Sequence, residues 1–189
     1  MLVASMHQAV AEHLPSRTDF YAPWLHSESL RTPRVSVAGI RAALSFLRRE
    51  DSAYEGTVRR AGALAAEWTW QRISGVRRAW LGGLPRRLRA RAACRLTREL
   101  AADAWRDTRV EVRWRKGEAV VSIYDSLFCG VRSRVPDALC GFYAAALERF
   151  LLELGVDAEA HSEHCAARGD APCTLGVTLN GLTKSGHLS

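Results

Sequence analysis

Apolar residues recur at helical spacing through the first half of the chain, which predicts a series of amphipathic helices. One apolar stripe predicts a helix over residues 36–49, with Ser36 as its N-cap. A second stripe predicts a helix over 53–73, and its small residues Gly62, Ala63, Ala65 and Ala66 leave room for another element to pack closely. Pro85 is placed at the first turn of a third helix, which we expect to run to residue 105.

The spacing of apolar residues changes from helical to alternating after Thr108. Val110, Val112 and Trp114 alternate with charged residues and predict a strand, which a turn at 116–118 joins to a partner strand over 119–128.

A helix follows the first predicted hairpin. We expect it to run over 138–154, with Asp137 as its N-cap and Gly155 as its stop. The segments 156–164 and 173–179 then predict a second hairpin.

The order of these elements predicts an α+β fold. N-terminal helices precede two β-hairpins, which form a four-stranded antiparallel sheet with a helix between them. We assign residues 1–33 to an N-terminal arm, 34–180 to one domain, and 181–189 to a flexible tail.

Composition supports one ordinary globular domain, since 48% of the 189 residues are hydrophobic. The N-terminus does not resemble a signal peptide, and no apolar run approaches the roughly 20 residues that a membrane span needs. We therefore expect a cytoplasmic protein, in which clustered cysteines bind metal or do redox chemistry more often than they form disulfides.

The net charge of +7 comes mainly from arginine, and nine arginines lie between Glu67 and Glu99 with no acidic residue among them. Phosphates, an acidic partner or an anionic membrane face would suit residues 72–98. Interleaved aromatics and a base-reading motif are missing, so we favour a solvated helix face and do not expect nucleic-acid binding.

Three of the five cysteines lie near the C-terminal end. Cys140 is placed at the start of the predicted helix after Asp137, where the helix dipole favours a thiolate. Cys165 and Cys173 flank a turn of seven residues, so a hairpin brings them together. Three thiolates need one more ligand to complete a tetrahedral zinc site. The candidates for the fourth ligand are Glu163, His161 and His164.

The other two cysteines have a simpler interpretation. Cys94 lies within the predicted third helix and Cys129 ends a predicted strand. Free cysteine is commonly buried, so we interpret both as small packing residues.

The series Cys140-Gly141-Phe142-Tyr143, a strand ending at Cys165, Gly169-Asp170, and Cys173 before an apolar strand resembles the 4-vinyl reductase-type domain. That family includes sensor domains of aromatic-responsive bacterial transcription activators and proteins linked to bacteriochlorophyll synthesis. It is structurally similar to subunits of the TRAPP vesicle-tethering complex.

The resemblance implies a structural zinc held by Cys140, Cys165 and Cys173. The family places a glutamate three residues before the first hairpin cysteine, where this chain has Ser162 with Glu163 next to it. Glu163 is our predicted fourth ligand, with His161 and Ser162 as alternatives.

The resemblance also implies a pocket for a hydrophobic small molecule, and often a homodimer. The aromatic residues that could line this pocket are Trp114, Tyr124, Phe128, Phe142 and Tyr143. Core packing explains each of them equally well when it is considered alone.

We therefore expect a small-molecule binding or sensing domain, which acts through a dimer or a separate regulatory protein. An enzyme or accessory factor in tetrapyrrole 4-vinyl reduction is the alternative, although no nicotinamide, flavin or cluster motif is visible. A scaffold similar to the vesicle-tethering subunits is the third possibility.

Overall fold

A computed structural model describes residues 1–25, 37–50, 52–115, 118–131 and 134–179. The predicted cap Ser36, part of the first hairpin turn and the predicted tail lie outside these residues. Within the described chain, no helix is both long enough and apolar enough to cross a membrane.

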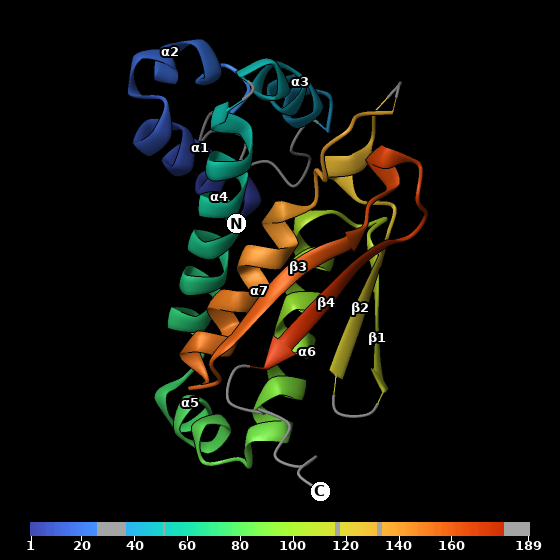
Figure 1. Cartoon of the computed structure of the whole chain (residues 1–189). Coiled ribbons are helices and arrows are strands. Elements are labelled where there is room, and N and C mark those ends of the chain that lie inside the picture. Colours follow the sequence, from blue (N-terminus) through green and yellow to red (C-terminus); the bar gives the residue numbers. More distant parts are fainter. Residues whose placement is uncertain (26–36, 51, 116–117, 132–133, 180–189) are drawn as a thin grey trace, which may run out of the picture.

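Four strands form one antiparallel sheet, which confirms the predicted α+β fold (Figure 1). The strands are β1 (Arg109–Arg115), β2 (Glu118–Tyr124), β3 (Ala158–His164) and β4 (Cys173–Leu179). They lie in the order β1-β2-β4-β3, so β2 and β4 join the two predicted hairpins along the middle of the sheet.

One face of the sheet is apolar because side chains alternate along each strand. Val121 and Ile123 of β2 pair with Leu175 and Cys173 of β4, and all four side chains are buried. Neighbouring residues of opposite orientation, such as Glu111 and Thr178, are more exposed. The helices therefore cover one face of the sheet.

The helices lie in layers on that face (Figure 1). Helices α6 and α7 contact the sheet, α4 packs on α7, and α1 packs on α4. The helices are α1 (Leu2–His13), α2 (Thr18–Tyr21), α3 (Val37–Leu47), α4 (Ser52–Arg72), α5 (Gly75–Gly82), α6 (Arg86–Ala104) and α7 (Gly141–Glu153).

Helices α4 and α7 approach closely at Gly62, as the small residues of this segment predict. A Cβ atom at this position would lie 2.1 Å from the backbone oxygen of Phe142. Only glycine therefore fits without a shift of one helix.

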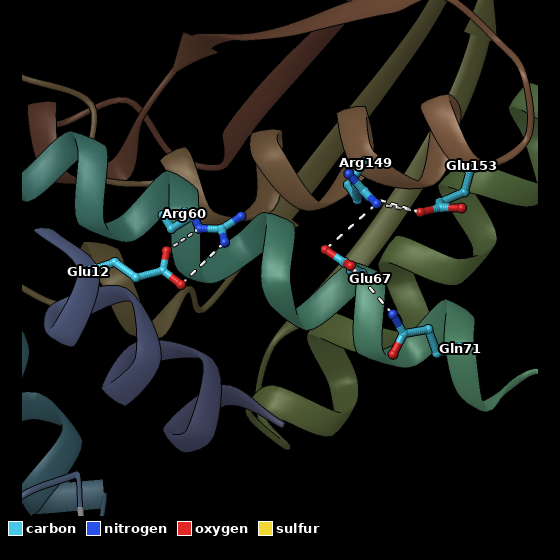
Figure 2. A network of polar contacts seen from close by, with 6 residues as sticks. All are labelled: Glu12, Arg60, Glu67, Gln71, Arg149 and Glu153. Carbon is cyan, nitrogen blue, oxygen red and sulfur yellow. Dashed lines mark hydrogen bonds and ion pairs between the residues drawn. The ribbon is translucent and has the colours of Figure 1, made fainter.

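Ion pairs tie the outer helices together at the surface (Figure 2). Glu12 of α1 accepts hydrogen bonds from Arg60 of α4. Arg149 of α7 contacts both Glu67 of α4, at 3.6 Å, and Glu153 of its own helix, at 2.7 Å. Exposed pairs of this kind stabilise a fold only modestly.

The start of α7 differs from the sequence prediction. The helix begins at Gly141 with Cys140 as its N-cap, and Asp137 lies in the preceding loop. The backbone of Leu139 explains the late start, because its carbonyl accepts a hydrogen bond from the Tyr54 hydroxyl and its N–H donates to the Cys165 sulfur. These tertiary partners replace the hydrogen bonds of a further helical turn.

Two other elements differ as well. Strand β2 ends at Tyr124 rather than at Phe128, and a 3-10 turn follows over Leu127–Cys129. Helix α5 was not predicted, since it is only eight residues long and has glycine at both ends.

Candidate metal centre and neighbouring cavity

Four cysteines from four separate segments meet in the interior. Cys129 ends the 3-10 turn after β2, Cys140 caps α7, Cys165 follows β3, and Cys173 begins β4. All four Sγ atoms lie within 4.8 Å of one another. The exposed fraction is 7% for Cys129 and 0% for the other three. This four-cysteine cluster is therefore shielded from solvent.

The spacing of the sulfurs suits a tetrahedral metal ion. The Cys129 sulfur lies 3.5 Å from that of Cys165 and 3.4 Å from that of Cys173. A zinc ion with Zn–S bonds of about 2.3 Å holds its sulfurs about 3.8 Å apart. The four thiols thus lie close enough to bind one metal ion with small side-chain adjustments.

Hydrogen-bond donors surround the sulfurs. The N–H of Leu139 donates to Cys165 at 3.3 Å, and the N–H of Ala166 donates to Cys173 at 3.2 Å. The Ser162 hydroxyl lies 3.2 Å from the Cys140 sulfur. Such donors stabilise the thiolate form, which is the form that binds metal.

The thiols also affect one another. Hydrogen bonding with the Cys129 thiol lowers the pKa of Cys165 and of Cys173, with Cys140 as the next contributor to each. The pKa of Cys129 is raised, chiefly by its hydrogen bond with Cys140. The thiolate form is therefore favoured more at Cys165 and Cys173 than at Cys129.

Four thiolates would leave a zinc ion no open coordination position, which is the pattern of a structural site. The cluster joins the end of the first hairpin, the start of α7 and both strands of the second hairpin. A metal ion at this point would hold a helix start onto the sheet rather than activate a water molecule.

The fourth member of the cluster is Cys129 and not Glu163. The Glu163 side chain is 41% exposed and lies over Gly176 beside His161, 3.9 Å from its Nε2 atom. His164 lies 3.9 Å from Asp170. These three side chains are not part of the cluster, so the structure does not support any of them as the fourth ligand.

Cys129 is the cluster member that sequence reasoning did not group with the other three cysteines. It was interpreted as a packing residue because free cysteine is commonly buried. The 3-10 turn after β2 instead brings it back over the sheet. Ser162, the other alternative ligand, does contact the cluster through Cys140.

The predicted aromatic residues do not surround one pocket. Phe128 stacks on Phe142 with ring centroids 4.8 Å apart, and both pack edge-on against Tyr143 in the core. Trp114 lies under the guanidinium of an α6 arginine, whereas Tyr124 lies on the opposite face of the sheet. Packing therefore accounts for these side chains better than a shared cavity.

A cavity of about 760 Å³ lies beside the cysteine cluster, between the loop before α7, the start of α4 and strand β3. Its apolar lining comes from Val135, Pro136, Ala138, Leu139 and Ala160. Its ionisable lining comes from Arg48, Tyr54, Glu55, Arg59, Asp137 and His161. Ser162 lines this cavity as well, so one hydroxyl faces both the cavity and the cluster.

The charged groups of the cavity differ in whether they have an ion-pair or hydrogen-bond partner. Arg59 is paired with Glu148 and lies 3.9 Å from Glu55. Burial raises the pKa of Glu55, whose carboxylate lies against Gly141 at the start of α7. The buried Nε atom of Arg48 has no hydrogen-bond partner among the described residues. Arg48 is therefore the group of this cavity most in need of an acceptor.

Comparisons with known proteins give no family assignment. No family model and no curated protein matches the chain. Among solved structures, the phenol-responsive sensory domain of the transcription activator PoxR, solved with phenol, matches at 14% identity with a TM-score of 0.44, over 82% of this chain and 74% of that one.

A second solved structure is a trafficking protein particle complex subunit 3 from Naegleria fowleri, covalently bound to palmitic acid. It matches at 16% identity with a TM-score of 0.37, over 95% of this chain and 97% of that one. These two proteins represent both classes of structure that the sequence resemblance named, whereas no match supports the 4-vinyl reductase family itself. Similarity at this level says nothing about the ligand of this chain.

Proposed function

We propose that the chain is a small-molecule binding or sensing domain in which a structural zinc ion holds the wall of the ligand cavity. The observation that carries this proposal is that two residues of the cavity lining also contact the cysteine cluster. Leu139 lines the cavity and donates its N–H to Cys165, and Ser162 lines the cavity and contacts Cys140. A metal ion on the four cysteines would therefore fix the shape of the cavity.

Zinc is the metal that suits this site. Four thiolates in a tetrahedral arrangement favour zinc or iron–sulfur chemistry over the hard cations magnesium and calcium. The ligand residues would be Cys129, Cys140, Cys165 and Cys173, with Leu139 and Ala166 as donors to the sulfurs. The zinc would have a structural role and no catalytic one.

The lining of the cavity indicates the chemistry of the ligand. Its apolar residues suit a hydrophobic body, and the guanidinium of Arg48 suits a hydrogen-bond acceptor on that body. Arg59 is already paired with Glu148, so it contributes less to recognition. The ligand class is therefore a hydrophobic molecule that carries one acceptor or anionic group.

A conformational change on ligand binding would be transmitted by α7. Its N-cap Cys140 belongs to the cluster, and its first residue lies against Glu55 at the cavity. A change in cavity occupancy would thus shift the start of this central helix. A second copy of the chain or a separate regulatory protein would respond to that shift.

Binding of 8-anilinonaphthalene-1-sulfonate, which combines aromatic rings with a sulfonate, tests the cavity. We expect saturable one-to-one binding to the folded wild type, measured by isothermal titration calorimetry. Ala138→Trp should weaken this binding at least about tenfold because the indole fills cavity space. Zinc content and thermal unfolding should stay unchanged, since Ala138 is a half-buried loop residue outside the cluster.

The matched control is Ala102→Trp, an exposed position on α6 away from the cavity. It adds the same side chain and should leave the affinity unchanged. Equal binding by both variants, or binding only by partly unfolded protein, would refute the cavity as the binding site.

A further inference from the structure

Exposed apolar side chains gather on α5 and the start of α6. Val76 is 84% exposed, Trp80 is 65% exposed and Leu88 is 41% exposed. Val76 and Trp80 are four residues apart on one helix, so they lie on the same side of α5. Large apolar side chains held in water at this level commonly mark an interaction surface.

A groove runs between the same two helices. Its volume is about 380 Å³, and its apolar floor includes Leu81, Leu84 and Leu96. Arg77, Arg91 and Arg95 line the groove beside Trp80 and Leu88. We call Val76, Arg77, Trp80, Leu88, Arg91 and Arg95 the α5–α6 patch.

The charge around the α5–α6 patch is almost entirely positive. The sequence has nine arginines and no acidic residue between Glu67 and Glu99. Arg95 pairs with Glu99 at the edge of this stretch. The remaining arginines without an ion pair among the described residues are Arg72, Arg77, Arg78, Arg87, Arg91 and Arg98. The partner of such a surface must carry negative charge.

The position of the patch favours a flat partner. Helix α5 forms one end of the molecule, opposite the end formed by α2 and α3 (Figure 1). Val76 and Trp80 are exposed side chains of this end helix, where a bilayer could meet them. Tryptophan beside arginine is the residue pair that suits the lipid headgroup region, with the indole among the acyl chains and the guanidinium groups at the phosphates.

We infer that the α5–α6 patch binds an anionic membrane surface. The exposed Trp80 and Val76 enter the headgroup layer, and Arg77 and Arg91 contact lipid phosphates. This inference is independent of the proposed ligand cavity and zinc centre, because it uses neither. A duplex nucleic acid would use the arginines alone, and the exposed apolar side chains would then have no role.

Vesicle co-sedimentation of the full chain tests the inference. We expect binding to vesicles of phosphatidylcholine with 30% phosphatidylglycerol at low salt, little binding to phosphatidylcholine alone, and a steep loss as salt rises. Arg77→Gln with Arg91→Gln should lower the partition coefficient about 25-fold, at about fivefold for each arginine. Trp80→Ser should lower it at least about tenfold.

The matched control is Arg106→Gln, an exposed arginine beyond the other end of α6. The 19 residues of α6 span roughly 28 Å, well beyond the screening length at 0.1 M salt, so in an assay at that salt concentration this change should alter binding less than about twofold. All variants should keep the wild-type unfolding temperature, since each site is exposed.

Three results would overturn the inference. One is no binding to anionic vesicles at low salt. Another is equal binding by wild type and by the Arg77 and Arg91 double variant. The third is a competition result, in which duplex DNA or an acidic peptide displaces the protein from vesicles at a lower concentration than free lipid does. The α5–α6 patch would then be assigned to the competitor that displaces the protein.

Discussion

Replacement of Cys129 by serine tests the metal centre at the ligand that sequence reasoning did not identify. The Cys129 sulfur lies 3.5 Å from that of Cys165 and 3.4 Å from that of Cys173, so it would be the fourth ligand of the proposed zinc ion. Cys129→Ser keeps the approximate shape of the side chain and removes the soft sulfur ligand. We expect zinc content to fall from about one per chain to well below one half.

The loss of stability follows from the loss of affinity. Removing a residue that only supports a zinc ligand weakens binding about 10- to 100-fold, so removing a ligand should cost at least about 100-fold. This factor corresponds to about 2.7 kcal/mol, and a bound metal stabilises the folded state in proportion to its affinity. Cys129→Ser should therefore lower the free energy of unfolding by about 3 kcal/mol or more in the presence of zinc.

Urea denaturation and metal analysis of the same samples measure both effects. Cys94→Ser is the matched control, because Cys94 is a buried cysteine of α6 outside the cluster. It should lose some packing energy and keep its zinc. Glu163→Gln should change neither quantity. Full zinc content in Cys129→Ser, or zinc loss in Glu163→Gln, would refute the four-cysteine assignment.

Two further predictions concern the helices. Gly62→Ala should lower the free energy of unfolding by about 1–3 kcal/mol in urea denaturation, because its Cβ would meet the Phe142 carbonyl. The control is Gly75→Ala, where a Cβ meets no other atom and no loss of stability is expected. No loss of stability in Gly62→Ala would contradict the close approach of α4 and α7. The hydrogen bond from Arg60 lowers the pKa of Glu12 to about 2, so this pair stabilises the fold above pH 4.5 and its contribution fades as pH falls to 2. In urea denaturation, the free energy of unfolding of the wild type should exceed that of Glu12→Gln by up to about 1 kcal/mol at pH 7, and the two should be equal near pH 2. A difference that does not change with pH would contradict this prediction.

Sequence periodicity was enough to predict the fold because each long element has one clearly apolar face. The hairpins, the order of helices and strands, and the close packing at Gly62 all follow from local patterns. Three cysteines could also be grouped, since helix start and hairpin spacing place Cys140, Cys165 and Cys173 near one another.

The remaining features depend on tertiary contacts that no local pattern records. Asp137 is a good N-cap by type, but Leu139 is held by Tyr54 and Cys165, so the helix starts later. Cys129 joins the cluster only because β2 ends early and the chain turns. Of the aromatic residues proposed for a pocket, Phe128, Phe142 and Tyr143 pack on one another, which their sequence positions alone do not distinguish from lining a cavity.

The burial of the cluster has a consequence for the rate of metal exchange. Three of the four sulfurs have no exposed surface, and the four segments that carry them belong to the hairpins and the central helix. A chelator could reach a zinc ion there only after the start of α7 separates from the sheet. Metal release would then be as slow as that local unfolding step, and its half-life would report how often the central helix detaches from the sheet.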